Sequence, residues 1–127
     1  MAIILLLADE AHGARLKSDL DYIGHQVKHV VLRGQSSLPV ITIEAVDLTI
    51  VDPESSLDRL AQAIAHLQQH RPTRTSSLLV VTDEMTALNL DFSIGISDFV
   101  IKPYSLRELE ARLRLALWND DRPPDEH

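Results

Sequence analysis

The stretch Asp47-Leu48-Thr49-Ile50-Val51-Asp52 decides the fold that we expect for this chain. Apolar and β-branched residues stand between two aspartates, and Pro53 disfavours helix at Asp52. The pattern therefore predicts a short buried strand that ends in an exposed carboxylate. In open parallel sheets, ligands bind at the carboxyl ends of the strands, so Asp52 is our first candidate for chemistry. The alternative is that Asp52 merely caps the next helix.

Strands and helices alternate along the rest of the chain. Apolar runs predict four further strands, at Ala2–Ala8, Gln26–Leu32, Leu78–Val81 and Asp98–Pro103. Apolar residues at helical spacing predict three helices, at Ala11–Ile23, along the stripe of Leu57, Leu60, Ile64 and Leu67, and at Tyr104–Trp118.

Two connections favour helix poorly. Pro39 and a β-branched run follow Gly34, so any helix between Gly34 and Val46 should be short or irregular. Polar residues scattered through Asp83–Ile94 weaken the helix expected there. The alternation as a whole predicts an α/β doubly wound fold, with five parallel strands and helices on both faces of the sheet.

Composition narrows the classes of function. The chain has 127 residues, enough for one domain, and no cysteine, which excludes thiol redox chemistry, thiolate zinc sites and disulfides. Its net charge of -7 argues against direct binding of this domain to nucleic acid or to an anionic membrane. No apolar run is long enough to span a bilayer, so we expect a soluble, cytoplasmic protein. A lone Gly13 after the first strand is no phosphate loop, which argues against an enzyme.

Polar residues follow four of the predicted strands. Asp9-Glu10 follow the first, Asp52 ends the third, Thr82 ends the fourth and Lys102 ends the fifth. Because these ends meet at one edge of a parallel sheet, we expect the side chains to converge. Carboxylates suit Mg²⁺, while a hydroxyl and an ammonium suit phosphoryl oxygens. Asp52 would then be a nucleophile that forms an acyl phosphate.

Four segments resemble the receiver domain of bacterial two-component response regulators. They are ILLLADE (residues 4–10), VDLTIVD (46–52), LLVVTDE (78–84) and GISDFVIKPYSLRELEARLRLAL (95–117). The sharpest part is Phe99 followed by two apolar residues and Lys102-Pro103, and the resemblance covers residues 2 to about 118. It implies the flavodoxin-like receiver fold, with strand order 2-1-3-4-5.

The resemblance also implies a role for each residue at the strand ends. Asp9, Glu10 and Asp52 correspond to the ligands of Mg²⁺, and Asp52 to the residue that a histidine kinase phosphorylates. Thr82 corresponds to the switch hydroxyl, and Lys102 to the lysine that contacts the phosphate. Phe99 corresponds to the aromatic ring that turns when the hydroxyl moves inward.

The last predicted helix has two apolar faces. Leu106, Leu109, Leu113 and Leu117 form one, and Ala111, Leu115 and Trp118 form the other. Its sequence resembles receivers attached to winged-helix DNA-binding domains, which implies a homodimer through segments 83–94, 98–103 and 104–118. The residues that the resemblance places in this interface are Asp98, Glu108, Ala111, Arg112 and Leu115. The charged, proline-containing residues 119–127 are expected to be a linker from the receiver domain, residues 1–118, to a DNA-binding domain outside this chain.

Two interpretations of the site remain. The retained acid, nucleophile, hydroxyl and lysine favour a receiver that is phosphorylated on Asp52. However, Asp83 follows the hydroxyl residue directly and would repel an anionic phosphodonor. The alternative is a receiver-like module that works by phosphorylation-independent dimerisation or protein interaction.

Overall fold

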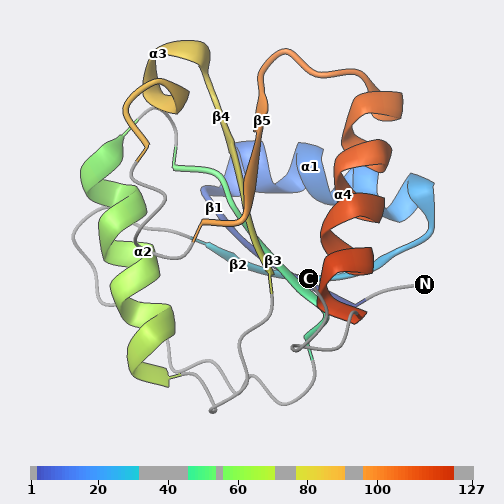
Figure 1. The fold of residues 1–127 in the computed structure, drawn as a ribbon, viewed down its shortest axis with the longest axis horizontal. Coiled ribbons are helices and arrows are strands. Elements are labelled where there is room, and N and C mark those ends of the chain that lie inside the picture. Colours follow the sequence, from blue (N-terminus) through green and yellow to red (C-terminus); the bar gives the residue numbers. More distant parts are fainter. Residues whose placement is uncertain (1–2, 32–45, 54–55, 71–76, 91–95, 122–127) are drawn as a thin grey trace.

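The computed structural model describes residues 3–31, 46–53, 56–70, 77–90 and 96–121. The strands are β1 (Ile3–Ala8), β2 (Gln26–Val31), β3 (Leu48–Val51), β4 (Ser77–Thr82) and β5 (Asp98–Ile101). The helices are α1 (Glu10–Ile23), α2 (Leu57–His70), α3 (Glu84–Ala87) and α4 (Leu106–Asp121). All paired strands are parallel, in the order β2-β1-β3-β4-β5 (Figure 1). The predicted fold class and strand order are confirmed.

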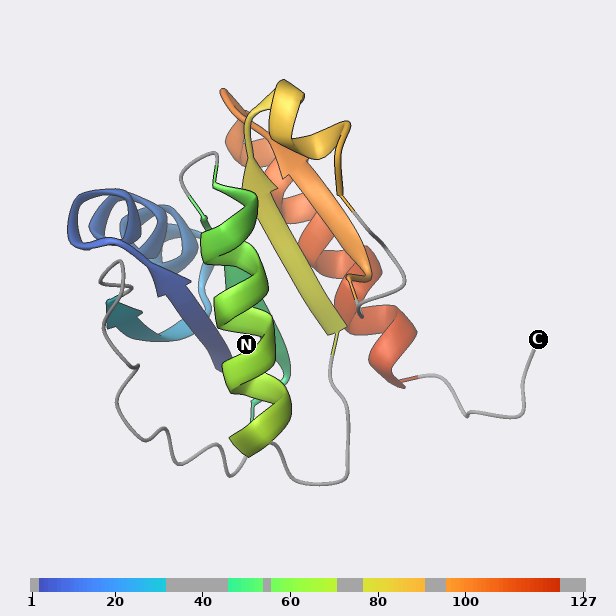
Figure 2. The same cartoon turned by 90° about the vertical axis from the view of Figure 1, so that its left-hand side faces the viewer.

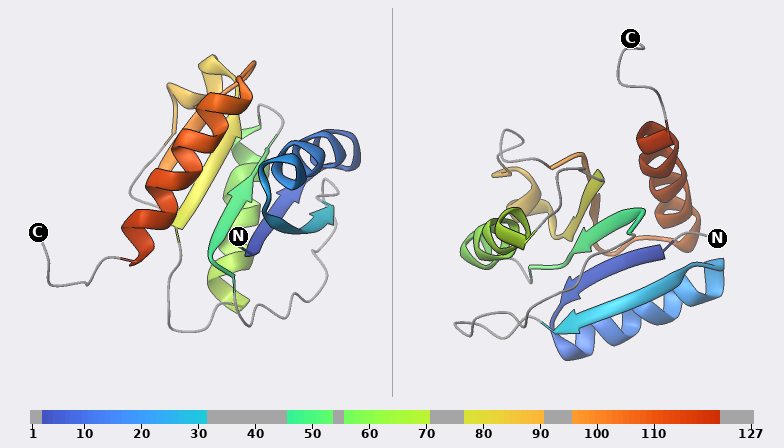
Figure 3. Two further views of the ribbon diagram at one scale, coloured as in Figure 1. Left: turned by 90° about the vertical axis from the view of Figure 1, so that its right-hand side faces the viewer. Right: turned by 90° about the horizontal axis from the view of Figure 1, so that it is seen from below.

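The sheet is covered on both faces. Alternate residues of β1 point to opposite sides, so Ile4 and Leu6 pack in one core cluster and Leu5 and Leu7 in another. The first cluster lies under α1 and α4, and the second lies under α2. In Figure 2, α2 lies in front of the sheet and α4 behind it. Figure 3 separates α2 and α3 on one side from α1 and α4 on the other.

Caps in the sequence fix the ends of α1. Asp9 is the N-cap, and Gly24 is the C-cap with a left-handed φ of 111°, as expected of a glycine stop. In α2, Leu60, Ala63 and Ile64 are buried, whereas Leu57 is 43% exposed. Leu57, the first residue of the predicted apolar stripe, is more exposed than the others because it starts the helix.

The last helix is longer than predicted. Ser105 caps its start by accepting a hydrogen bond from the backbone N–H of Glu108, 3.0 Å away. Leu109, Leu113 and Ala116 form the buried face. Within the described residues the helix runs on to Asp121, three residues into the expected linker.

Several sequence predictions fall partly outside the described residues. The connection between β2 and β3, where a short or irregular helix was expected, covers residues 32–45, which the structure does not describe. Between β4 and β5 the described part contains the four-residue α3, which agrees with the weak helix propensity of Asp83–Ile94. The remaining predicted linker, residues 122–127, also lies outside the description. Within the described ranges, every helix is too short or too polar to cross a bilayer.

Candidate functional site

Backbone hydrogen bonds hold the predicted site residues at one edge of the sheet. The N–H of Asp52 donates to the carbonyl of Leu7 at 2.8 Å, which ties the end of β3 to β1. The N–H of Lys102 donates to the carbonyl of Thr82 at 2.8 Å, which ties the end of β5 to β4. The lysine is followed by a cis Lys102–Pro103 peptide bond. The positions of these three side chains are therefore set by the sheet itself.

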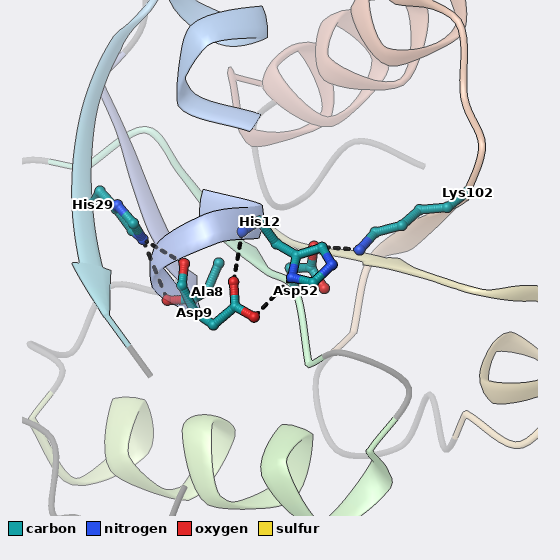
Figure 4. Close-up of polar contacts among 6 residues, drawn as sticks. All are labelled: Ala8, Asp9, His12, His29, Asp52 and Lys102. Carbon is teal, nitrogen blue, oxygen red and sulfur yellow. Dashed lines mark hydrogen bonds and ion pairs between the residues drawn. The ribbon is translucent and has the colours of Figure 1, made fainter. Parts of the chain in front are cut away.

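Asp52 and Lys102 form an ion pair. The Lys102 Nζ lies 2.6 Å from Oδ2 of Asp52 (Figure 4), and the Asp52 side chain is 2% exposed while that of Lys102 is 29% exposed. The prediction of an exposed carboxylate was wrong, because Asp52 ends a central strand and Lys102 reaches over it. Burial raises the pKa of Asp52 above its ordinary value, and the hydrogen bond and charge of Lys102 oppose that rise without cancelling it.

The carboxylate of Asp9 is held by His12, in the next turn of the chain. Its Oδ1 accepts the backbone N–H of His12 at 2.6 Å, and its Oδ2 lies 2.7 Å from Nδ1 of the His12 ring. Burial acts to raise the pKa of Asp9, but the hydrogen bonds and charge of His12 outweigh it, so the pKa is lowered overall. Lys102 contributes to the lowering, which places Asp9 within electrostatic reach of the Asp52–Lys102 pair.

The hydroxyl of Thr82 is buried and unpaired within the described part of the chain. Thr82 is 1% exposed, and its Oγ1 finds no hydrogen-bond partner among the described residues. Phe99, the predicted switch aromatic, is partly buried and packs on the α2 side of the sheet. An unsatisfied buried hydroxyl costs about 1–3 kcal/mol, so this group is a candidate for an interaction that arises when a ligand or phosphoryl group arrives.

The predicted magnesium ligands are brought together in part. Asp9 and Asp52 lie close enough for the charge of Asp9 to raise the pKa of Asp52. Glu10 is exposed in the first turn of α1. Within the described ranges, no group of three acidic or histidine side chains is arranged to hold a metal. Mg²⁺ usually takes one or two protein carboxylates plus waters, so the donor pair of Asp9 and Asp52 fits this ion.

A cavity of about 520 Å³ opens beside the ion pair. Its lining includes Asp52 and Lys102 together with His12 and Arg15 of α1. Tyr104, at the rim, donates a hydrogen bond to Oδ2 of Asp19 at 2.8 Å and so ties the start of α4 to α1. That hydrogen bond and burial both raise the pKa of Tyr104.

Sequence reasoning missed two histidines near Asp9. The Nε2 of His29, on β2, lies 3.3 Å from the carbonyl oxygen of Ala8 and 3.2 Å from that of Asp9 (Figure 4). Its ring fills the space where a side chain at Gly13 would be, because a Cβ there would overlap Nε2 of the ring. His12 had a signal in the sequence, since it stands three residues after an aspartate N-cap. His29 had none, because its contact depends on strand pairing.

The predicted dimer residues lie on β5 and α4. Asp98 pairs with Arg112 inside the chain, with 3.2 Å between Oδ2 and Nη1. Glu108 and Ala111 are exposed, and Leu115 is 48% exposed. The second apolar face of the last helix, predicted from its spacing, is therefore present at the surface, where Trp118 is 57% exposed.

Comparison with known proteins identifies the family. Residues 1–117 match the family model described as the N-terminal domain of the transcription regulator GlnR. The chain belongs to this family. The probable transcriptional regulator ycf27 of Cyanidium caldarium is 32% identical over 118 residues, which cover 89% of this chain and 45% of ycf27. The chain thus spans about half the length of the curated relatives that it matches.

Solved structures agree with this assignment. A putative response regulator from Chloroflexus aurantiacus superposes with a TM-score of 0.71 and 25% identity, covering 92% of this chain and 98% of that one. The receiver domain of the sensor histidine kinase PA1611 from Pseudomonas aeruginosa superposes with a TM-score of 0.68 and 16% identity, covering 92% of this chain and 98% of that one. That structure has a magnesium ion coordinated in its active site cleft. This GlnR-family chain is therefore a response-regulator receiver domain.

Proposed function

We propose that this receiver domain regulates a transcription factor and that Asp52 is its phosphoacceptor. One observation carries the proposal. Three adjacent strands end in groups that suit a phosphoryl site: the buried carboxylate of Asp52, the ammonium of Lys102 paired with it, and the buried hydroxyl of Thr82, which has no partner in the described part of the chain. A phosphoryl group on Asp52 would give Thr82 the acceptor that it lacks and Lys102 a second anionic partner.

The transfer requires a balanced displacement at phosphorus. A carboxylate oxygen of Asp52 attacks the phosphorus of a donor, such as a phosphohistidine of a histidine kinase. The new O–P bond forms as the bond to the donor breaks, and the donor departs with that electron pair. Lys102 then neutralises charge on the phosphoryl oxygens, and the hydroxyl of Thr82 donates a hydrogen bond to one of them.

Magnesium is the cofactor that the donor set suits. Asp9 and Asp52 would hold it, and it would supply positive charge that offsets the repulsion between the carboxylate and an anionic donor. The coordinated ion in the PA1611 receiver supports this proposal by fold likeness. Asp83, the acidic residue after Thr82, is used as the N-cap of α3, where its Oδ1 accepts the backbone N–H of Thr86 at 2.7 Å.

The proposed output lies outside this domain. The relatives are transcription regulators about twice as long as this chain, so we propose that another domain binds DNA and that this one regulates it from the cytoplasm, without acting as a metabolic enzyme. A homodimer through α3, β5 and α4 would transmit the signal, and the exposed Leu115 and Trp118 on α4 support such a surface.

Intact mass spectrometry tests the phosphoacceptor. The chain is incubated with acetyl phosphate and Mg²⁺, and we expect the mass of one phosphoryl group to be added to the wild type and none to Asp52→Asn. Asp21→Asn is the matched control, because Asp21 is exposed on α1 and pairs with Lys17 far along the helix from Asp9. Phosphorylation that persists in Asp52→Asn would disprove the assignment.

The phosphorylation-independent module is the second candidate. It is favoured by the 2% exposure of the Asp52 side chain, which an attacking donor must first uncover, and by Lys102, which already neutralises the carboxylate. If no donor modifies the wild type, and if Asp52→Asn changes the dimerisation constant all the same, the ion pair itself would be the regulatory element.

A further inference from the structure

The His12 ring holds the carboxylate that we assign to the cation site. Asp9 serves α1 as an N-cap through its Oδ1, which accepts the backbone N–H of His12 at 2.6 Å. That single bond satisfies the cap. The contact of the ring nitrogen with Oδ2, at 2.7 Å, is additional and occupies the second oxygen of the same carboxylate. Both oxygens of Asp9 are thus engaged by one residue.

The ring also lines the cavity beside the Asp52–Lys102 ion pair. Asp52 and Lys102 line the same cavity as His12, and Figure 4 draws the three side chains together. The His12 side chain is 49% exposed, whereas that of Asp9 is 20% exposed. The ring is therefore the more exposed partner of the Asp9–His12 contact.

We propose that His12 is a built-in competitor for the divalent cation at Asp9. In the resting domain the imidazole occupies Oδ2, and Mg²⁺ binds the Asp9–Asp52 pair once the ring has turned away. The two cannot share the oxygen without loss, because Mg²⁺ needs its ligand at about 2.0–2.1 Å in near-octahedral geometry and a donor on the same oxygen weakens it as a ligand. This inference rests on the proposed function, because it concerns how Mg²⁺ gains access to the cation site proposed there.

Titration calorimetry with MgCl₂ at one fixed pH tests the competition. His12→Ala removes the ring and keeps the backbone N–H that caps α1, so the Kd for Mg²⁺ should fall by about tenfold, the size expected for one charge-assisted hydrogen bond. The matched control is Arg15→Ala, which removes a permanent positive charge from the same helix and the same cavity but leaves both Asp9–His12 hydrogen bonds in place. We expect its Kd to stay within about twofold of the wild type.

Further measurements distinguish the loss of the Asp9–His12 contact from a loss of folding. In an Asp9→Asn background, His12→Ala should no longer change the Kd, and circular dichroism should show that each variant is folded. An equal gain in Arg15→Ala would mean that general charge, and not the ring, controls the site, and would overturn the inference. So would an unchanged Kd in His12→Ala, or Mg²⁺ binding to neither protein. If Asp52 is still phosphorylated in any of those cases, the proposed function stands and the role of His12 alone fails.

Discussion

At the scale of single residues, Asp52 and Thr82 are both placed at a cost to stability. A carboxylate and a hydroxyl are buried at the ends of adjacent strands, and the hydroxyl has no acceptor in the described part of the chain. Groups of this kind are retained where function needs them, since an apolar residue of similar shape would pack equally well. If burying these two groups lowers the free energy of unfolding, replacing either of them should raise it.

Asp52→Asn should stabilise the resting domain at neutral pH. Because the pKa of Asp52 is raised above its ordinary value of 3.8, the folded state binds this proton more tightly than the unfolded chain does. Its contribution to stability is complete below pH 3.8 and is lost as the pH rises through the raised pKa. We expect the variant to unfold with a free energy higher by about 1 kcal/mol at pH 7. Urea unfolding at several pH values measures this, and a gain that grows toward acid pH would contradict it.

Thr82→Val should also stabilise the resting domain. The substitution keeps the shape of the side chain and removes a hydroxyl that has no partner among the described residues, so the free energy of unfolding should rise by about 1 kcal/mol. Thermal unfolding of the two proteins measures the difference, with Thr86→Val as a control at another buried threonine. A clear loss of stability in Thr82→Val would show that the hydroxyl is already satisfied in solution.

At the scale of elements, the turn from β1 into α1 depends on a side chain from β2. His29 lies against the carbonyl oxygens of Ala8 and Asp9, and Gly13 leaves room for its ring. The position of Asp9 is thus linked to the edge strand of the sheet. No local pattern could have indicated this, because the contact joins residues about 20 positions apart.

Gly13→Ala should therefore destabilise the domain, although alanine is the better helix former by about 1 kcal/mol. The new Cβ would meet the His29 ring, so the ring must leave both carbonyls, and we expect a net loss of about 1–2 kcal/mol. In a His29→Ala background the same substitution should be neutral or stabilising. A double-mutant cycle by urea unfolding gives the coupling energy, and strict additivity would argue against this contact.

At the scale of the whole molecule, the sequence was sufficient for the fold and for the meeting of the polar residues at the strand ends. Buried strands and amphipathic helices set the topology, and the strand ends then placed Asp52, Thr82 and Lys102 together. What the sequence could not provide was side-chain direction. Asp52 turned out to be buried under Lys102, and Glu10 turned out to be exposed, because both depend on packing between elements and not on spacing along the chain.

The association of two copies is also predicted at this scale. Leu115→Glu places a charge on the exposed face of α4 and should leave the monomer folded, because Leu115 is outside the core. If that face joins two copies, the association constant should fall by at least about tenfold in sedimentation equilibrium. Tyr22→Glu, at an exposed aromatic residue on α1, is the control and should have little effect. An equal effect of both substitutions, or of neither on a dimeric parent, would place the interface elsewhere.

The central claim is that Asp52 becomes an acyl phosphate, and ³¹P NMR of the intact chain tests it most directly. After addition of acetyl phosphate and Mg²⁺, we predict a protein-bound acyl-phosphate resonance in the wild type that is absent in Asp52→Asn. The absence of any protein-bound phosphate in the folded wild type, or the same resonance in both proteins, would contradict the claim.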